Sequence, residues 1–196
     1  TVPGAVYTDQ LTRGYEKPRD QISAELYQAG VRDVTADHWA AGSLTVMMQA
    51  GLMVPDGAGR LNPEDPVSAA DGISAFAKVL GIASRLDTPE VAAEKAKAAG
   101  IIPADTTIDR PMARVEVARL IATALGVQPK WVTRETYPFN DWDLVAPEDA
   151  YILAALYDLG IFTGYPDRTF RPDQTLSRAE LAALIDRVLG AFASAS

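Results

Sequence analysis

The sequence predicts an all-α protein built from three helix-loop-helix repeats. Three segments share one plan: an Ala-rich run, a Gly followed by two apolar residues, a polar loop, and a second apolar run that closes in Leu-Gly. The internal signals are Gly51-Leu52-Met53, Gly100-Ile101-Ile102 and Gly160-Ile161-Phe162, and the closing pairs are Leu80-Gly81, Leu125-Gly126 and Leu189-Gly190. Because the plan recurs three times at similar spacing, it indicates a repeat array.

The chain is expected to divide into four parts. These are an N-terminal connector or capping helix, repeat one, a divergent repeat two and repeat three, over residues 1–30, 31–84, 85–130 and 131–196. The same pattern predicts one helix in the N-terminal part and two in each repeat. They are expected over residues 20–29, 40–50, 70–80, 91–99, 114–125, 150–159 and 178–189.

The helical assignment is clearest in the third repeat, where apolar residues recur at intervals of three and four, as one face of a helix requires. They are Ile152, Leu153, Leu156 and Leu159 in the first helix and Leu181, Leu184, Ile185 and Val188 in the second. Gly160 suits the left-handed position that ends a helix, and a loop rich in turn formers follows it. Helices of this length do not bury an apolar face alone, so the repeats are expected to pack together.

Composition and charge disfavour several function classes. The 196 residues carry a formal charge of −8, whereas binding to nucleic acid or anionic lipid needs clustered Lys and Arg. No apolar run is long enough to span a bilayer, so membrane insertion is not expected either. The chain has no cysteine and one histidine, His38, so we expect no thiol chemistry, no His-pair metal site and no cofactor.

The segment Ser177-Arg178-Ala179-Glu180 precedes and opens the last predicted helix, and it has two interpretations. As a capping box, Ser177 accepts a hydrogen bond from a free backbone N–H and Glu180 reaches back to the cap residue. A capping box does not explain Arg178, because a cation in the first helical turn opposes the helix dipole. An Arg beside free N–H groups is explained if an anion, such as the carboxylate of a sugar, binds there.

The corresponding position differs among the repeats. Repeat two keeps Arg114 and Glu116 but has lost the capping hydroxyl. Repeat one keeps the cap and the acid but has Ala69 at the Arg position. At most two anion sites are therefore expected, and Arg178 provides the better one.

One stretch, residues 160–180, reads G-I-F-T-G-Y-P-D-R-T-F-R-P-D-Q-T-L-S-R-A-E. It resembles the S-layer homology family, whose pattern runs roughly G-I-x-x-G-Y-P-D-G-T-F-R-P and, a few residues later, I-T-R-A-E. Here Arg168 stands for a Gly, Leu176 for Ile and Ser177 for Thr. The family's opening F-x-D and W-A are matched in part in repeats one and three. The resemblance covers about residues 31–190 and is weakest in repeat two.

The resemblance implies a fold, a ligand and a location. Family members pack three repeats as a pseudo-threefold helical spindle, with ligand grooves between neighbouring repeats. They are non-catalytic modules that anchor exported proteins at the bacterial cell surface. Their ligand is a secondary cell-wall polysaccharide, often recognised through a pyruvate ketal, or modified peptidoglycan. Self-assembly into an S-layer would then depend on a cargo domain outside this sequence.

Carried over to this sequence, the resemblance nominates a set of ligand-binding residues. Arg178 and Arg114 are the expected anion contacts, each with the cap or acid of its own motif. A glycine, a tyrosine and an aspartate of the third loop are expected to shape the groove wall beside Arg178. Trp39 either stacks on a sugar face or anchors a helix start in the core. The full set is Arg178, Arg114, Ser177, Glu180, Glu116, Gly164, Tyr165, Asp167 and Trp39.

Two other function classes compete with this interpretation. A glycosidase would need a converging pair of carboxylates, and no such pair, P-loop, zinc motif or Ser-His-Asp pattern is marked in the sequence, so we expect no enzyme. The acidic clusters also lack the spacing of a helix-loop-helix calcium site. The alternative is a helical scaffold or oligomerisation module with degenerate glycan sites, which the loss of Arg in repeat one favours.

Overall fold

The computed structural model describes residues 17–195, which form α-helices and loops without a β-strand. In chain order the helices are α1 (Arg19–Gln28), α2 (Ala41–Gln49), α3 (Ala69–Val79), α4 (Pro89–Ala98), α5 (Arg114–Leu125), the short 3-10 helix η2 (Trp142–Leu144), α6 (Pro147–Asp158) and α7 (Arg178–Ala195). The all-α prediction is confirmed for this part of the chain. Within it, no helix is both long enough and apolar enough to cross a membrane. Residues 1–16 of the expected N-terminal segment lie outside the described residues.

The predicted helix boundaries lie within three residues of the observed ones except at the end of α7. The sequence predicts that Gly190 closes this helix, but α7 continues past it. Gly190 lies inside the helix with open space beside it, whereas Gly81 and Gly126 have φ of +73° and +63° and do follow the ends of α3 and α5. α6 begins at Pro147, earlier than predicted, because proline is favoured in a first helical turn.

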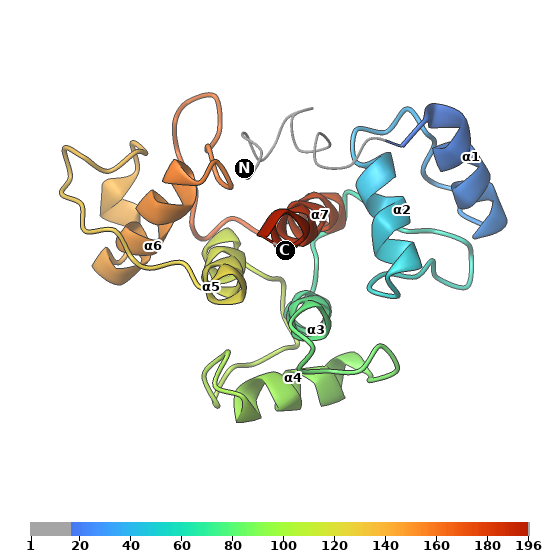
Figure 1. The fold of residues 1–196 in the computed structure, drawn as a ribbon, viewed down its shortest axis with the longest axis horizontal. Helices are drawn as coiled ribbons and strands as arrows, with labels where there is room; N and C mark the ends of the chain where they lie inside the picture. The colour runs from blue at the N-terminus through green and yellow to red at the C-terminus, as the bar shows by residue number, and fades with distance from the viewer. Residues whose placement is uncertain (1–16, 196) are drawn as a thin grey trace.

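Three helices, α3, α5 and α7, lie at the centre of the molecule and are seen nearly end-on in Figure 1. Each contacts the other two. Each also carries an outer helix: α4 packs on α3, α6 on α5 and α2 on α7, with α1 outside α2. The outer helix of one predicted repeat therefore packs on the central helix of another, and these contacts cross every expected repeat boundary.

A ring of three backbone hydrogen bonds joins the segments that precede the central helices. Val67 N donates to Leu176 O at 2.9 Å, Leu176 N donates to Met112 O at 3.1 Å, and Met112 N donates to Val67 O at 2.9 Å. All three side chains are buried. Because each residue is both donor and acceptor, the ring closes on itself and ties together segments that are far apart in the sequence.

The core consists mainly of small and aliphatic side chains from the inward faces of these helices, as the periodicity predicts. Of the apolar residues that predict the third repeat, most are buried, while Ile152 is half-buried and Leu159 is exposed. The buried ones are Leu153, Leu156, Leu181, Leu184, Ile185 and Val188. Two charged side chains of α7, Asp186 and Arg187, also lie inside the core.

Candidate functional site

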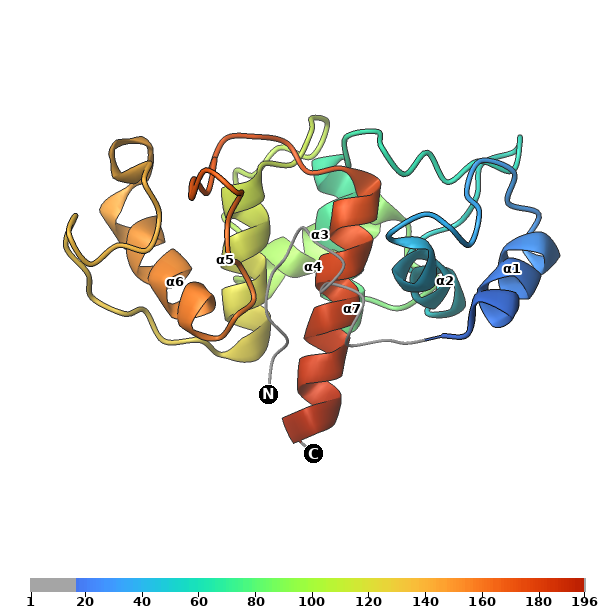
Figure 2. The ribbon, with the colours of Figure 1, turned by 90° about the horizontal axis from the view of Figure 1, so that it is seen from above.

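The N-termini of the three central helices lie at the same end of the molecule, together with the loops that precede them (Figure 2). The motif residues Arg178 and Arg114 are the first residues of α7 and α5, and Ala69 is the first residue of α3. The structure therefore brings both motif arginines, and the position where the third is missing, to one end of the helix bundle.

The first two backbone N–H groups of each central helix donate to carbonyl groups of a neighbouring loop. The six bonds measure 2.7–3.1 Å and run from Arg178 to Asp65, Ala179 to Pro63, Arg114 to Gln174, Val115 to Pro172, Ala69 to Arg110 and Ala70 to Ile108. The expectation of free N–H groups beside Arg178 is therefore wrong, because the neighbouring loop already uses them. An anion at this end of the molecule would have to contact side chains.

Arg178 extends from α7 onto the loop of repeat one. Its Nε donates to the carbonyl oxygen of Leu61 at 2.8 Å, and its Nη1 donates to Oδ2 of Asp71 at 3.4 Å. The carbonyl contact offsets the cost of a cation in the first helical turn. About a fifth of the side chain is exposed (18%), and Nη2 has no acceptor among residues 17–195. Nη2 is therefore the donor that this arginine can offer to a ligand.

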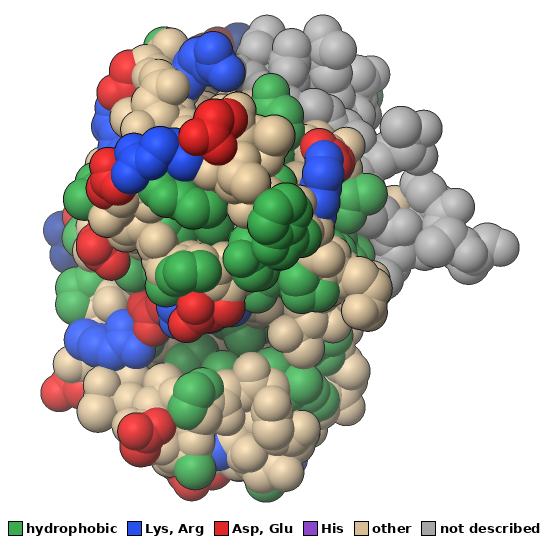
Figure 3. Space-filling view, turned by 90° about the vertical axis from the view of Figure 1, so that its left-hand side faces the viewer, with side chains coloured by type: hydrophobic (Ala, Val, Ile, Leu, Met, Phe, Trp, Pro, Cys, Tyr) green, Lys and Arg blue, Asp and Glu red, His purple; other side chains and the backbone are tan. Residues whose placement is uncertain are grey.

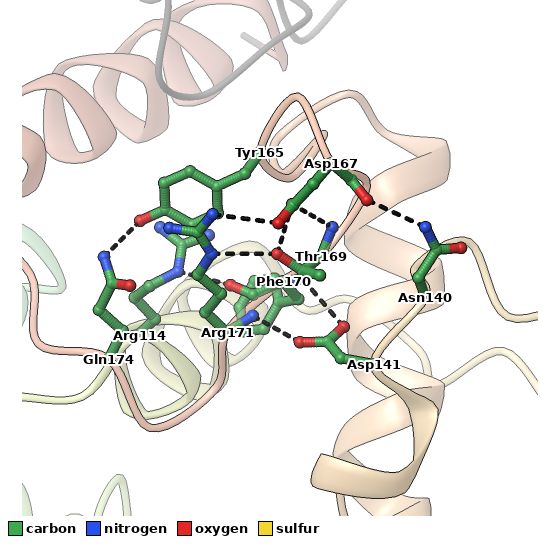
Figure 4. Close-up of polar contacts among 9 residues, drawn as sticks. All are labelled: Arg114, Asn140, Asp141, Tyr165, Asp167, Thr169, Phe170, Arg171 and Gln174. Carbon is green, nitrogen blue, oxygen red and sulfur yellow. Dashed lines mark hydrogen bonds and ion pairs between the residues drawn. The ribbon is translucent and has the colours of Figure 1, made fainter.

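Arg114 has a different environment from Arg178. Its Nε donates to the carbonyl oxygen of Phe170 at 2.7 Å, which parallels the bond from Arg178 to Leu61. The guanidinium carbon, however, lies 4.6 Å from the ring centre of Tyr165 and 4.7 Å from that of Phe170, and the residue is fully buried (Figure 4). In this conformation no ligand can contact Arg114, so the two motif arginines are not equivalent.

The third-loop tyrosine belongs to the Arg114 environment rather than to that of Arg178. The hydroxyl of Tyr165 accepts a hydrogen bond from Gln174 Nε2 at 2.8 Å, and its ring lies between the guanidinium groups of Arg114 and Arg171 (Figure 4). Burial raises the pKa of the Tyr165 hydroxyl, although the two arginines lower it. The third loop was expected to form the groove wall beside Arg178. Arg178 instead contacts the loop of repeat one.

Gly164 and Asp167 hold the third loop in its shape. Gly164 has φ of +78°, and a Cβ there would lie 2.7 Å from the ring of Phe139, so only glycine fits without a rearrangement. The carboxylate of Asp167 accepts hydrogen bonds from Thr169 N at 3.0 Å and from Arg171 Nη2 at 3.2 Å. Both residues therefore stabilise the conformation of the third loop.

The capping boxes of α7 and α5 are each half complete. Ser177 Oγ accepts a hydrogen bond from Glu180 N at 3.1 Å, but Glu180 Oε2 is buried and has no hydrogen-bond partner among the described residues. Burial raises the pKa of Glu180, while nearby Arg114 lowers it. In α5 the acid does the capping, since Glu116 Oε2 accepts a hydrogen bond from Ala113 N at 2.8 Å.

Trp39 is partly exposed (39%), which does not fit a core anchor. Its ring stacks on His38, with the ring centres 5.9 Å apart. His38 Nε2 in turn lies 2.8 Å from a carboxylate oxygen of Glu64. Glu64 precedes Asp65, whose carbonyl oxygen accepts a hydrogen bond from Arg178 N. The Trp39 ring is thus linked to the same loop of repeat one that Arg178 contacts.

Sequence reasoning missed the aspartates that shape the loops of repeats one and three. Asp141 accepts hydrogen bonds from Phe170 N at 3.0 Å and Arg171 N at 2.7 Å (Figure 4). Asp33 accepts two from the first loop, at 2.9 and 2.8 Å. Both are the aspartate of the F-x-D pattern, which served only as a marker of the family. The sequence contains these aspartates, but their role in accepting hydrogen bonds from the loop backbone was not inferred from the pattern.

A cavity of about 310 Å³ lies between α3, the loop before α5, and α5 itself. Arg110 lines this cavity and forms a bidentate ion pair with Glu116. Sequence reasoning did not identify Arg110. Among the described residues, no group of three or more His, Asp or Glu side chains is placed to hold a metal ion.

Comparison with known proteins agrees with the resemblance over residues 138–182. Residues 138–182 match the model of the S-layer homology domain, a non-catalytic family. Over 82 residues, 39% of this chain, the sequence is 32% identical to cell surface glycoprotein 1 of Acetivibrio thermocellus. Over 171 residues, 78% of the chain, it is 26% identical to an S-layer protein of Bacillus thuringiensis subsp. finitimus.

These two relatives are far longer than the present chain. The matched part covers 3% of the glycoprotein and 20% of the S-layer protein. The match to the family model includes Asp141, the turn around Gly164 and the start of α7, so it covers the loop and helix N-terminus described above. The chain is therefore similar to S-layer homology domains over residues 138–182, to a cell surface glycoprotein over 39% of its length and to an S-layer protein over 78% of its length.

Proposed function

We propose that this protein is a cell-surface module that binds a cell-wall polysaccharide, with Arg178 contacting an acidic group of the polymer. The observation that carries the proposal is the position of Arg178. Its Nε is held by the Leu61 carbonyl and its Nη1 lies 3.4 Å from Asp71, while Nη2 has no acceptor in the described chain. A pyruvate ketal would present a carboxylate to this guanidinium, and charge-assisted bonds of that kind are among the strongest. The similarity of residues 138–182 to S-layer homology domains, which typically anchor S-layer proteins to cell-wall polysaccharide, supports the ligand class.

The proposal includes three S-layer-homology-like repeats, over residues 31–84, 85–130 and 131–196, arranged as a pseudo-threefold spindle. It is supported by the closed ring of backbone bonds and by the corresponding N–H contacts at the three helix starts. The ligand would bind at the junctions between repeats. α1, which packs on α2, would serve as a capping helix.

Recognition in this proposal depends on local contacts rather than on a long-range field. The net charge is −8, and the face in Figure 3 shows acidic and basic side chains interspersed. A surface of this kind does not steer an anionic polymer toward the protein. Binding would therefore come from placed donors such as Arg178 and from stacking on the exposed ring of Trp39.

A helical scaffold is the second candidate, and the burial of Arg114 favours it. This arginine is packed among aromatic rings and bonded to a loop carbonyl, which gives the motif arginine of repeat two a structural role. If Arg178 had only the same role, the fold would be retained without any glycan ligand. The two functions make opposite predictions for a substitution of Arg178. A glycan-binding module should lose wall binding, whereas a scaffold should be unaffected in any wall binding.

The test is binding to purified bacterial cell-wall sacculi, before and after mild acid removes ketal-linked pyruvate. Three proteins are compared: wild type, Arg178→Gln and the control Arg134→Gln, whose exposed pair with Asp143 lies away from this junction. We expect wild type and the control to bind untreated walls, and Arg178→Gln to lose at least tenfold in affinity, which corresponds to about 1.4 kcal/mol. Acid treatment should abolish wild-type binding.

Thermal unfolding of the same three proteins separates loss of binding from loss of fold. If neither the Arg178→Gln substitution nor the acid treatment reduces binding, the proposed anion contact is wrong and the scaffold is favoured. Binding lost on acid treatment but kept by Arg178→Gln would place the acidic sugar elsewhere on the protein.

A further inference from the structure

The turns of the first and third loops follow the same backbone path. Each turn is closed by two backbone hydrogen bonds of 2.8–3.0 Å. They run from Asp56 N to Arg60 O and from Gly59 N to Asp56 O in the first loop, and from Tyr165 N to Thr169 O and from Arg168 N to Tyr165 O in the third. Asp56 therefore occupies the position in the first loop that Tyr165 occupies in the third.

The two motif arginines meet these loops at corresponding places. Leu61 and Phe170 directly follow the two turns, and their carbonyl oxygens accept hydrogen bonds from Nε of Arg178 at 2.8 Å and from Nε of Arg114 at 2.7 Å. The backbone contact of the two arginines is thus the same. The difference in their exposure must come from the side chains around them.

In the third loop, the ring of Tyr165 lies over Arg114. Its ring centre is 4.6 Å from the guanidinium carbon of Arg114 and 3.8 Å from that of Arg171, and its hydroxyl accepts a hydrogen bond from Gln174 Nε2 at 2.8 Å (Figure 4). Two cation–π contacts and one hydrogen bond therefore hold the ring in place. We call Tyr165, Arg171 and Gln174 together the Tyr165 cover.

The first loop has no such cover. The residues at the positions of Tyr165, Arg171 and Gln174 are Asp56, Asn62 and Asp65, none of which has a ring or a positive charge. Asp56 turns its carboxylate into its own loop, where Oδ1 accepts hydrogen bonds from Ala58 N at 2.8 Å and Arg60 N at 3.0 Å. Its Oδ2 pairs with Arg60 Nε at 3.3 Å, so the charge of Asp56 is balanced locally.

The exposure of the two arginines follows this difference. The side chain of Arg178 is 18% exposed, whereas Arg114 is fully buried. Phe162 and Phe170 also pack on Arg114, with ring centres 5.8 and 4.7 Å from its guanidinium carbon, but both phenylalanines are themselves fully buried. Tyr165 is only half-buried, so its ring is the one that separates Arg114 from solvent.

We propose that the residue at the position of Asp56 and Tyr165 determines whether a motif arginine is open to an anion. Tyr165 closes the environment of Arg114, and Asp56 leaves that of Arg178 open. Access to each arginine is thus set by the loop of another predicted repeat and not by the motif that contains the arginine. The identity of the anion as an acidic sugar rests on the proposed function, whereas the open or closed state of each guanidinium does not.

The first test measures the accessibility of each arginine without any glycan. The full protein is treated with phenylglyoxal, which modifies guanidinium groups, and the rate at each arginine is read by mass spectrometry of peptides. We expect Arg178 to react in wild type and Arg114 to be protected. Because a buried group reacts only when the structure opens locally, Tyr165→Ala should raise the rate at Arg114 about tenfold. The matched control Tyr165→Phe keeps the ring over Arg114 and should leave it protected.

The second test builds the cover into the first loop. The variant combines Asp56→Tyr, Gly57→Pro, Ala58→Asp and Asn62→Arg, which gives this loop the side chains of the third. The backbone accepts them, since a Cβ at Gly57 meets nothing within 4 Å, and Asn62 has φ of +51° where Arg171 has +60°. We expect the rate at Arg178 to fall about tenfold and that at Arg114 to stay unchanged. The control has Asp56→Ala with the same three other changes and should leave Arg178 reactive.

The two tests are independent, so the second still decides if Tyr165→Ala does not fold. Protection of Arg114 that persists in folded Tyr165→Ala would mean that Phe162 and Phe170 alone bury it, and this result overturns the proposal. Equal rates at Arg178 in the covered variant and its control also overturn it.

Binding of the same variants to cell-wall sacculi separates this inference from the proposed function. If both hold, the covered variant loses about tenfold in wall affinity and its control does not. If accessibility follows the ring but wild type does not bind walls, the cover is confirmed and the proposed function fails. If Arg178→Gln abolishes wall binding while accessibility ignores the ring, the cover is wrong and the proposed function stands.

Discussion

The buried carboxyl of Asp186 joins α7 to an outer helix. Its Oδ2 accepts a hydrogen bond from Ser43 Oγ of α2 at 2.9 Å, and only 4% of the residue is exposed. Burial raises the pKa of Asp186 to about 6, although Ser43, Arg187 and Lys17 act to lower it. The folded protein therefore takes up a proton at this site more readily than the unfolded chain.

Asp186 should make stability depend on pH in an unusual direction. Because its folded pKa lies above the unfolded value, its contribution is greatest below the unfolded pKa and is lost as the pH rises through about 6. We expect the stability of wild type relative to Asp186→Asn to increase by about 2–3 kcal/mol between pH 7.5 and pH 4. Urea unfolding of both proteins across this range measures the difference. A difference that is constant with pH would show that Asp186 does not titrate there.

Arg168 occupies a backbone conformation that favours glycine. Its φ is +61° and its side chain is exposed, at the position where the S-layer homology pattern has Gly. We expect Arg168→Gly to stabilise the protein by about 1 kcal/mol, since a left-handed conformation costs a non-glycine residue roughly that much. The control Arg134→Gly, at an exposed site outside this turn, should give no gain. Equal effects in the two variants would mean that the strain is absent.

At the scale of single residues, the sequence predicted which side chains matter but not their environment. It identified Arg178 and Arg114 as a matched pair, and the structure does bond both through Nε to a neighbouring loop. It could not show that Arg114 is fully buried, because the rings that pack on it, Tyr165 and Phe170, belong to a loop that is distant in the sequence. Arg110 was missed because its partner Glu116 and its cavity become visible only when the loop is folded.

At the scale of whole helices, periodicity was enough to place every predicted element, but the Leu-Gly pairs were ambiguous. All three have the same composition, yet only the first two lie at the end of a helix. Gly126 adopts φ of +63°, and its N–H donates to the carbonyl of Thr123. Gly190 lies inside α7, which continues past it toward the C-terminus, away from the loops (Figure 2). Local composition therefore does not distinguish a Leu-Gly pair that ends a helix from one that lies inside a helix.

The two glycines should therefore respond in opposite ways to alanine. Gly190→Ala is expected to stabilise the protein by about 0.5–1 kcal/mol, because alanine loses less entropy in a helix and the added Cβ meets nothing within 4 Å. Gly126→Ala is expected to destabilise it by about 1 kcal/mol, because φ is positive. Chemical denaturation gives both values. Two changes of the same sign would contradict the assignment of one glycine to a helix and the other to a cap.

At the scale of the molecule, the sequence predicted that the repeats pack together but not how. The packing of α2 on α7 and the ring through Val67, Met112 and Leu176 connect the first predicted repeat to the last. No local pattern encodes such contacts, since they depend on which loop crosses which helix. They imply that the described chain unfolds as one cooperative unit and not repeat by repeat, unlike an open array in which each repeat contacts only its neighbours.

Gly72 offers a direct test of this cooperativity. It lies in α3 where the helix crosses Met112, and a Cβ there would be 2.2 Å from the Met112 sulfur atom. We expect Gly72→Ala to cost about 1–3 kcal/mol by forcing the ring residue Met112 away. Gly190→Ala is the matched control, since it has the same gain in helix propensity without a clash.

The readout for Gly72→Ala separates a local effect from a global one. The tryptophans Trp39, Trp131 and Trp142 lie in the predicted repeats one and three, whereas Met112 lies in the predicted repeat two. If the ring couples the repeats, tryptophan fluorescence and far-UV circular dichroism will show the same lowered midpoint in urea, because coincident transitions mark a single cooperative unit. A fluorescence midpoint that stays at the wild-type value while part of the helical signal is lost earlier would show that repeat two unfolds independently.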